Sequence, residues 1–334
     1  MKLKSFICGF AALFVFAGVA AAQSPAYKIS SPYSHKNLTI YLIHGKDETS
    51  KTNILTLQEA MERKILRVYE TSDVNELAVE NISKTFDVFI QSGDIVKGGK
   101  QDRILGVSII IAAHSGRIKI EAFCVESGRW QKRGNEDAGQ FSSSNDRIVS
   151  KELKLAANGE RSQQEVWAKV SEAQEKLEKN LGGSVTSANS QSSLQLSLEN
   201  SKVRATADEY VRKLSGLIEG KSDVIGYAFS VNGKINSADV YVSNALFKKL
   251  WPRMLKAAAI EAVAEHDDRA AVRPAAKPEE IKAFMSGADQ GPAEERAASG
   301  SSRVVTRDKK DSAVYEARDE KSKTVVHRAY VKKQ

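Results

Sequence analysis

Residues 224–242 read VIGYAFSVNGKINSADVYV, and this stretch indicates how the chain folds. Its two halves, residues 224–231 and 234–242, are rich in the β-branched and aromatic residues that favour strands. Between them stands Asn232-Gly233, a pair that suits a tight type I′ turn because both positions of that turn need positive φ. The stretch therefore predicts a β-hairpin, and with it an antiparallel sheet.

Helical patterns lie on both sides of this hairpin. Apolar residues recur at steps of three or four over residues 166–181 and 203–217, which predicts two amphipathic helices of about 20 residues each. A last helix is expected over residues 244–265, with Pro252 disturbing its early part. Residues 181–194 are rich in Gly, Ser, Thr, Asn and Gln and are expected to form a flexible connector.

Strands dominate the earlier part of the chain, residues 38–125. Within it, residues 104–113 form a nearly continuous apolar run, which suits a strand buried on both faces. One helix is expected over residues 57–64, because Thr56 and Glu59 form a T-x-x-E capping box at its start. Since strands precede helices instead of alternating with them, the order argues against a doubly wound fold.

We therefore expect an α+β fold in which antiparallel sheets, with a sandwich as one arrangement, are covered by three or four helices. The single main domain should span residues 37–265, after a lead-in of residues 23–36. Residues 266–312 carry mixed charges and few large apolar side chains, so they are expected to be a mobile, mostly disordered tail with at most a short helix. Residues 313–334 contain two β-prone runs around a charged turn and could form a terminal hairpin.

Residues 1–22 have the pattern of a secretory signal peptide. Lys2 and Lys4 give a positive start, residues 6–19 are mostly apolar, and residues 20–22 supply small side chains before the cut. The apolar run is shorter than the roughly 20 residues that a membrane-spanning helix needs. We expect an exported, periplasmic or secreted protein with no stable membrane span after cleavage.

The charge pattern argues against nucleic acid as a partner. The formal charge of +8 comes from 50 basic and 42 acidic residues, and cleavage would remove Lys2 and Lys4. The remaining surplus is spread along the chain without a long basic block, whereas a nucleic-acid surface concentrates Lys and Arg on one face.

Cysteine and histidine usage predicts neither a metal site nor a cofactor. After cleavage Cys124 is the single cysteine, so no internal disulfide can form, and its register on the apolar side of a strand favours a buried, inert thiol. The five histidines are scattered without the spacing of a zinc site. The sequence also shows no G-x-S-x-G motif and no convincing Ser/His/Asp grouping.

The segment richest in polar chemistry is GGKQDR, residues 98–103. Adjacent Gly98 and Gly99 let the backbone turn and expose amide groups that could hold an anion, while Lys100 and Arg103 would add positive charge. The alternative is a structural turn whose polar side chains tie neighbouring loops together.

A second candidate segment follows the strand that contains Cys124. Glu126 and Arg129 could pair with each other or face a ligand, and Trp130 could form a flat wall for a ring, although an edge of the core is the alternative. Asp102 or Glu126 could also act as a general base, with Arg129 stabilising negative charge. The ligand-binding candidates are Gly98, Gly99, Lys100, Gln101, Asp102, Arg103, Glu126, Arg129 and Trp130.

The order of these motifs resembles a known family. The segments that carry the resemblance are residues 55–60, 74–81, 92–103, 124–130, 225–229 and 246–252. Together they resemble the ADP-ribosylglycohydrolase- and rhodanese-phosphatase-superfamily-associated protein domain over about residues 37–265. The family name records an association with enzymes of ADP-ribose and phosphate chemistry. The resemblance implies ligand recognition by the candidates above, together with Glu76 and Asn81.

These features favour an exported, non-enzymatic binding or scaffold module for an anionic or nucleotide-like small ligand. Two alternatives stay open. One is a hydrolase of a small phosphorylated or ADP-ribose-like substrate. The other is an envelope protein whose ordered carboxyl end pairs with the edge of a partner's sheet.

Overall fold

The structure is a computed structural model that describes residues 27–48, 53–147, 150–267 and 273–333. The expected signal peptide lies outside the described residues. Within these ranges, no helix combines the length and the apolar character needed to span a bilayer.

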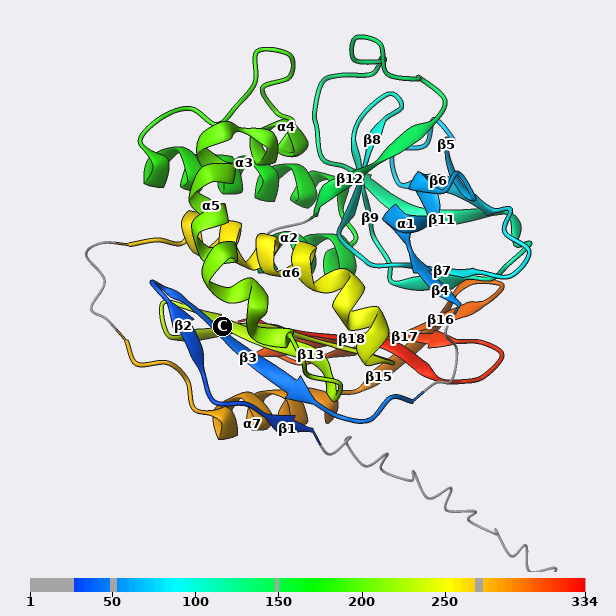
Figure 1. Cartoon of the computed structure of the whole chain (residues 1–334). Helices are drawn as coiled ribbons and strands as arrows, with labels where there is room; N and C mark the ends of the chain where they lie inside the picture. The colour runs from blue at the N-terminus through cyan, green and yellow to red at the C-terminus, as the bar shows by residue number, and fades with distance from the viewer. Residues whose placement is uncertain (1–26, 49–52, 148–149, 268–272, 334) are drawn as a thin grey trace, which may run out of the picture.

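A nine-stranded sheet joins the two ends of the described chain (Figure 1). Its strands, in spatial order, are β1 (Lys28–Ile29), β3 (Leu38–His44), β13 (Val224–Val231), β14 (Lys234–Tyr241), β18 (Val325–Lys332), β17 (Ser312–Asp319), β16 (Ser302–Asp308) and β15 (Ala293–Ser299), with β2 (Tyr33–His35) also paired to β3. All these pairs are antiparallel. Asn232 and Gly233 have φ of 52° and 72° at the β13–β14 turn, which confirms the predicted hairpin.

Seven helices complete the described part of the chain. They are α1 (Leu57–Glu62), α2 (Lys151–Leu155), α3 (Gln163–Leu181), α4 (Leu194–Glu199), α5 (Ser201–Leu214), α6 (Asn244–Ala264) and α7 (Pro278–Asp289), with a π-helical turn at Ala156–Glu160 and a 3₁₀ turn at Ser215–Ile218. Helices α3, α5 and α6 lie on one side of the large sheet, and α7 lies on the other (Figure 1). The predicted helices over residues 166–181 and 244–265 are confirmed as α3 and α6, while α5 is shorter than expected.

Two smaller sheets pack against each other beside the helices. One consists of β10 (Ile109–Ile111), β7 (Asp87–Ile90) and β4 (Ile54–Thr56). The other consists of β12 (Phe141–Arg147), β8 (Asp94–Gly98), β9 (Arg103–Leu105), β11 (Gly116–Cys124), β6 (Glu76–Asn81) and β5 (Leu66–Glu70). Both sheets contribute to one apolar core, for example through Ile90 and Val79. Apart from the parallel pair β4–β7, their strands pair antiparallel, so the predicted α+β class is confirmed.

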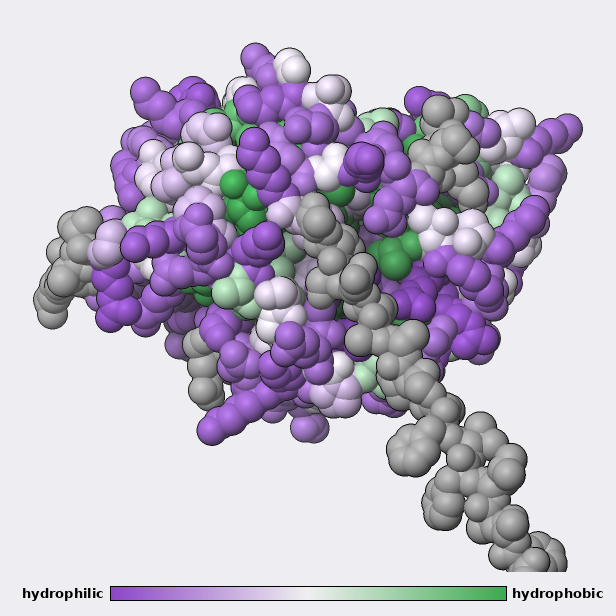
Figure 2. All heavy atoms as spheres, turned by 90° about the horizontal axis from the view of Figure 1, so that it is seen from below, coloured by the Kyte–Doolittle hydropathy of each residue, from purple (hydrophilic) through white to green (hydrophobic). Residues whose placement is uncertain are grey.

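The region after residue 272 is folded, contrary to the mostly disordered tail expected over residues 266–312. It forms α7, β15 and β16, which continue the large sheet, so the domain does not end at residue 265. The low apolar content of this region suggested disorder, but few apolar residues are needed here. Helix α7 buries a single stripe, which includes Ile281, Phe284 and Met285, and β15 is a largely exposed edge strand. Figure 2 shows the face seen from below as mostly hydrophilic, with small separate apolar spots.

The expected terminal hairpin is confirmed, but it lies inside the sheet. β18 pairs with β14 on one side and with β17 on the other, and β17 also pairs with β16. Both backbone edges of the hairpin are therefore used within the chain. Among the described residues, neither edge of this hairpin is left for the sheet of a partner.

The apolar run over residues 104–113 is divided between two strands, contrary to the single strand expected. β9 ends at Leu105, and β10 begins at Ile109 in a different sheet. Gly106 lies at this crossing, where a Cβ would stand 2.7 Å from the ring of Phe123. The run is apolar because each of its halves enters a core, and Ser108 lies between them.

The connector between α3 and α4, within residues 181–194, is attached to the core. Val185 is buried there, and Ser192 Oγ donates a hydrogen bond to the Ser127 carbonyl at 2.7 Å. Ser193 is the N-cap of α4 and is also buried. The polar composition thus marks a chain reversal that packs against the following elements.

Helix α6 carries a buried carboxyl group toward the sheet. Glu261 is 2% exposed, and its Oε1 accepts hydrogen bonds from Asn236 Nδ2 at 2.6 Å and from the Lys151 amide at 3.1 Å. Oε2 has no hydrogen-bond partner among the described residues. Burial raises the pKa of Glu261 to about 7, although the nearby Lys154 acts in the opposite direction.

Raising the pH should therefore destabilise the fold through Glu261. The unfolded chain ionises this carboxyl above its ordinary pKa of 4.5, whereas the folded chain keeps it protonated up to about pH 7. Its contribution to the free energy of unfolding is complete below pH 4.5 and is lost by about pH 7, at roughly 1.4 kcal/mol per unit or about 3 kcal/mol in all. Urea unfolding of the wild type and Glu261→Gln across this range should show the variant gaining relative stability by about that amount.

Glu265→Gln is the matched control, one turn further along and 36% exposed. Its stability difference from the wild type should vary little over the same pH range. A constant difference between Glu261→Gln and the wild type would contradict the prediction.

Candidate functional site

The two polar segments singled out in the sequence are neighbours in space. Strands β9 and β11 pair with Arg103 opposite Cys124. The turn before β9 and the loop after β11 therefore lie at the same end of the six-stranded sheet. Their charged side chains meet there in what we call the ionic cluster, formed by Glu70, Asp102, Arg103, Glu126, Arg129 and Arg133.

Asp102 is the centre of the ionic cluster. It is fully buried, and its carboxylate accepts two hydrogen bonds from Arg133, at 2.8 and 3.1 Å. The Gly98 amide donates to it at 3.1 Å and Ser193 Oγ at 3.3 Å. Burial raises the pKa of Asp102, while the Arg133 guanidinium acts in the opposite direction. Asp102 thus holds together the turn, the loop after β11 and the start of α4.

Glu126 is fully buried and bound to Arg129 on both oxygens. Arg129 Nε donates to Oε1 at 2.8 Å and Nη2 donates to Oε2 at 2.7 Å, which is a bidentate pair. Burial acts to raise the pKa of Glu126, but the hydrogen bonds from Arg129 and Ser190 outweigh it and lower the pKa. Because Arg133 and Arg129 hold both oxygens of Asp102 and of Glu126, the structure does not favour either as a general base for a bound substrate.

Arg103 is also part of the protein interior. Its Nη1 donates to the Val74 carbonyl at 2.7 Å, and its Nη2 donates to Glu70 at 3.2 Å. The Gln101 side chain is buried as well and donates to the Glu126 carbonyl at 2.8 Å. Arg103 and Gln101 therefore stabilise the turn from inside the protein and are not available to a ligand at the surface.

The glycine pair uses its amide groups within the chain. Gly98 and Gly99 have φ of 113° and 57°, the region that favours glycine, and a Cβ on Gly99 would lie 2.3 Å from the Phe141 ring. The Gly98 amide donates to Asp102, and the Gly99 amide donates to the Asp137 carbonyl at 3.0 Å. The glycines therefore allow close packing and give their amides to protein acceptors.

Lys100 and Trp130 are the candidates that remain at the surface. Trp130 is 45% exposed, and Ile82 at 38% is the other exposed large hydrophobic side chain among the described residues. Lys100 Nζ lies 5.0 Å from the centroid of the Trp130 ring and donates to Ser72 Oγ at 2.9 Å. We call this pair the Lys100–Trp130 surface.

A family model described as the ARG and Rhodanese-Phosphatase-superfamily-associated Protein domain matches residues 26–331. The chain belongs to this family. No curated protein and no solved structure matches the chain. The match extends the family domain well beyond the residues 37–265 expected from the sequence, and it includes α7 and strands β15 to β18.

Within this family domain, Cys124 is buried, as predicted. The side chain is fully buried, and burial raises its pKa to about 11. The parts of the chain that the structure describes contain no group of three or more His, Cys, Asp or Glu side chains arranged to hold a metal ion. The ionic cluster consists of three carboxylates and three arginines that form ion pairs with one another.

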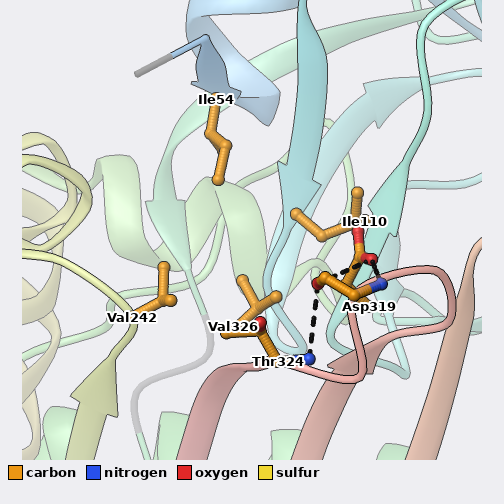
Figure 3. Close-up of a pocket in the computed structure, with 7 residues that line it drawn as sticks. Ile54, Ile110, Val242, Asp319, Thr324 and Val326 are labelled. Atoms are coloured by element: carbon orange, nitrogen blue, oxygen red, sulfur yellow. Dashed lines mark hydrogen bonds between the residues drawn. The ribbon is translucent and has the colours of Figure 1, made fainter. Parts of the chain in front are cut away.

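A depression elsewhere in the family domain is mainly apolar. It lies where the nine-stranded sheet meets the three-stranded sheet and has a volume of about 230 Å³, including its open part. Residues that line it include Ile54, Ile110, Val242 and Val326 (Figure 3). Asp319 stands at its edge, where its carboxylate accepts hydrogen bonds from the amide and the hydroxyl of Ser322. That carboxylate stabilises the β17–β18 turn.

Three residues at the ionic cluster were missed in the sequence analysis. Arg133 and Glu70 complete the ionic cluster, and Ser193 joins it from the start of α4. Each stands in a polar stretch where many similar side chains are exposed. Their roles depend on contacts across 30 or more residues of sequence, and no local pattern marks such contacts.

Proposed function

We propose that this protein is an exported binding module for a small anionic ligand that contains a ring, such as a nucleotide. The ligand would bind at the Lys100–Trp130 surface. The observation that carries the proposal is the exposed Trp130 ring, held 5.0 Å from the Lys100 ammonium group. Export is supported by the signal-peptide pattern of residues 1–22.

The chemistry of the two side chains supports this class of ligand. An exposed indole offers a flat face on which a base or another ring can stack. A lysine ammonium beside it can pair with a phosphate or carboxylate of the same ligand. The remaining charges of the ionic cluster are paired internally, so they contribute little attraction of their own.

The ionic cluster supports the surface by fixing its backbone. Arg129, the residue before Trp130, is bound to Glu126, and the turn before Lys100 is bound to Asp102 through the Gly98 amide. A surface held in place before binding loses less conformational entropy when a ligand arrives. Under this proposal Asp102, Glu126 and Arg129 are positioning residues.

Substitution of Trp130 should weaken binding most. With ADP-ribose and AMP as probes, Trp130→Ala should raise Kd about 10- to 100-fold, because stacking on an aromatic side chain contributes about 1–3 kcal/mol. Lys100→Gln should raise Kd by a smaller factor and make binding less sensitive to salt. Isothermal titration calorimetry on the chain from Gln23 gives both values.

Two variants serve as matched controls. Ile82→Ala removes the other exposed large hydrophobic side chain, and Lys132→Gln removes an exposed charge two residues after Trp130. Both should keep the wild-type Kd. The proposal is wrong if the wild type binds neither probe, or if Trp130→Ala and Lys100→Gln bind as tightly as the wild type.

A further inference from the structure

Three side chains that are far apart in sequence meet at the inner face of the large sheet. His327 of β18 stands between Ser108, which precedes β10, and Asp239 of β14. Its Nδ1 lies 3.1 Å from Ser108 Oγ, and its Nε2 lies 2.9 Å from Asp239 Oδ1. A hydroxyl, an imidazole and a carboxylate are thus arranged in series, the order of groups found in nucleophilic hydrolases.

The hydrogen bonds define which ring nitrogen can act as a base. Asp239 is buried, which acts to raise its pKa, but the hydrogen bond from His327 and the charge of Lys154 lower the pKa below its ordinary value. The carboxylate can only accept, so Nε2 carries the hydrogen of the neutral imidazole. Nδ1 then directs its lone pair toward Ser108.

The surroundings of Ser108 direct its hydroxyl hydrogen toward the imidazole. Ser108 Oγ accepts a hydrogen bond from the Ser92 amide at 3.0 Å. Its own O–H is therefore available to donate to Nδ1 of His327. Ser108 combines an accepted backbone hydrogen bond with a base within reach, which is the geometry of an activated nucleophile.

Aromatic side chains fix the imidazole ring. Tyr241 stacks on His327 with centroids 4.8 Å apart and an interplanar angle of 22°. Phe89 contacts the same ring edge-on at 5.7 Å. Because His327 is only 2% exposed and is packed against these two rings, its orientation is set before any substrate binds.

Ser108 connects this arrangement to a pocket. The residue is 9% exposed and lines a narrow pocket of about 280 Å³, including the part open to solvent. Arg296, Glu316 and Asn158 line the same pocket and give it one cation, one carboxylate and one amide. Arg296 uses Nη2 to donate to Glu121 at 2.9 Å. The pocket is narrow, and its charged groups already have partners, Glu121 for Arg296 and Arg328 for Glu316, so it suits a short, uncharged acyl group.

We propose that Ser108, His327 and Asp239 form a nucleophilic centre that hydrolyses small esters with a short acyl group. Ser108 Oγ attacks the carbonyl carbon while His327 Nδ1 takes the hydroxyl proton, and Asp239 stabilises the imidazolium. The bond to the leaving oxygen then breaks, and that oxygen takes the proton and leaves as an alcohol. Water, activated by His327, releases the carboxylic acid from Ser108 and restores the hydroxyl.

The ring is turned end for end relative to the serine-protease triad, in which Nε2 faces the nucleophile. Either nitrogen of a neutral imidazole can accept a proton when the other is hydrogen-bonded to a carboxylate. The proposal is independent of the Lys100–Trp130 surface, which involves different residues at the end of the six-stranded sheet. The hydrolytic centre and the Lys100–Trp130 surface can therefore be tested separately, and failure of one proposal does not affect the other.

The test uses the chain from Gln23 with p-nitrophenyl acetate, the smallest convenient ester of this class. We expect release of p-nitrophenol above the buffer rate, and peptide mass spectrometry of the quenched reaction should find acetyl on Ser108. Ser108→Ala should abolish the acetylation and lower the enzymatic rate at least about 100-fold, and His327→Gln should lower the rate similarly. Melting curves should show that the variants are folded.

Ser144→Ala is the control, because Ser144 is also buried but its hydroxyl donates to Gln195 instead of contacting a histidine. It should keep the wild-type rate. The proposal is overturned if the folded wild type releases no product above buffer, if acetyl is found only on other residues, or if Ser108→Ala keeps the rate. If Ser108→Ala does not fold, the site of acetylation in the wild type decides the question.

Discussion

A chain that ends at Lys321 should lose the native fold entirely. The truncation removes β18, which lies between β14 and β17, and exposes the backbone edges of both neighbours. It also removes buried side chains, among them Val326, Tyr330 and Val331. Each contributes about 1.5–3 kcal/mol of burial, so with the lost hydrogen bonds the total rivals the roughly 5–15 kcal/mol stability of a whole domain.

Circular dichroism and thermal unfolding measure this loss. The chain ending at Lys321 should show no cooperative transition, whereas a chain ending at Lys332 retains the whole of β18 and should melt near the wild-type temperature. A cooperative transition in the shorter chain would show that the last strand is dispensable, in conflict with its place in the sheet.

Asp102→Ala should cause the largest loss among single substitutions in the ionic cluster, about 3–5 kcal/mol of unfolding free energy. The change leaves the Arg133 guanidinium largely buried with only part of its hydrogen bonding, and it removes the acceptor for the Gly98 amide. The loss of unfolding free energy comes from buried polar groups that are left without partners, and it exceeds the net stabilisation that the ion pair itself provides.

Urea unfolding at neutral pH gives the comparison. Asp208→Ala, at an exposed position on α5, should change stability by no more than about 0.5 kcal/mol. The double variant Asp102→Asn/Arg133→Met should recover part of the stability that Asp102→Ala loses. In this variant no arginine is left without its carboxylate. Equal losses in Asp102→Ala and Asp208→Ala would count against a central role for Asp102.

Elements that depend on neighbouring residues were predictable from the sequence. The Asn232-Gly233 turn has the positive φ values that the pair favours. Thr56 and Glu59 make both hydrogen bonds of the predicted capping box, from the Glu59 amide to Thr56 and from the Thr56 amide to Glu59. Each feature involves atoms within three positions of one another, so the local sequence contains the information.

Elements that depend on distant partners were not predictable in this way. β15 and β16 are polar enough to suggest a disordered tail, yet pairing with β17 and contacts with the small sheets place them in the fold. The apolar run over residues 104–113 indicated burial correctly. It did not indicate that Gly106 turns the chain from one sheet into another.

The candidate sites follow the same division. Asp102, Glu126 and Arg129 were recognisable as a concentration of charge, but their burial follows from Arg133 and from the packing of α4. Ser108 stands in an apolar run and lies 219 positions before His327, so no spacing motif could connect the two. They meet because the segment before β10, in the three-stranded sheet, packs against β18 of the large sheet.

The pairing of the large sheet also affects how fast the sheet can form. Its central strand β18 pairs with β14, and β3 pairs with β13 although residues 45–223 separate the two strands in sequence. Contacts between such distant segments form slowly. Folding of this protein is therefore expected to be slower than that of a protein of the same length whose contacts are mostly local.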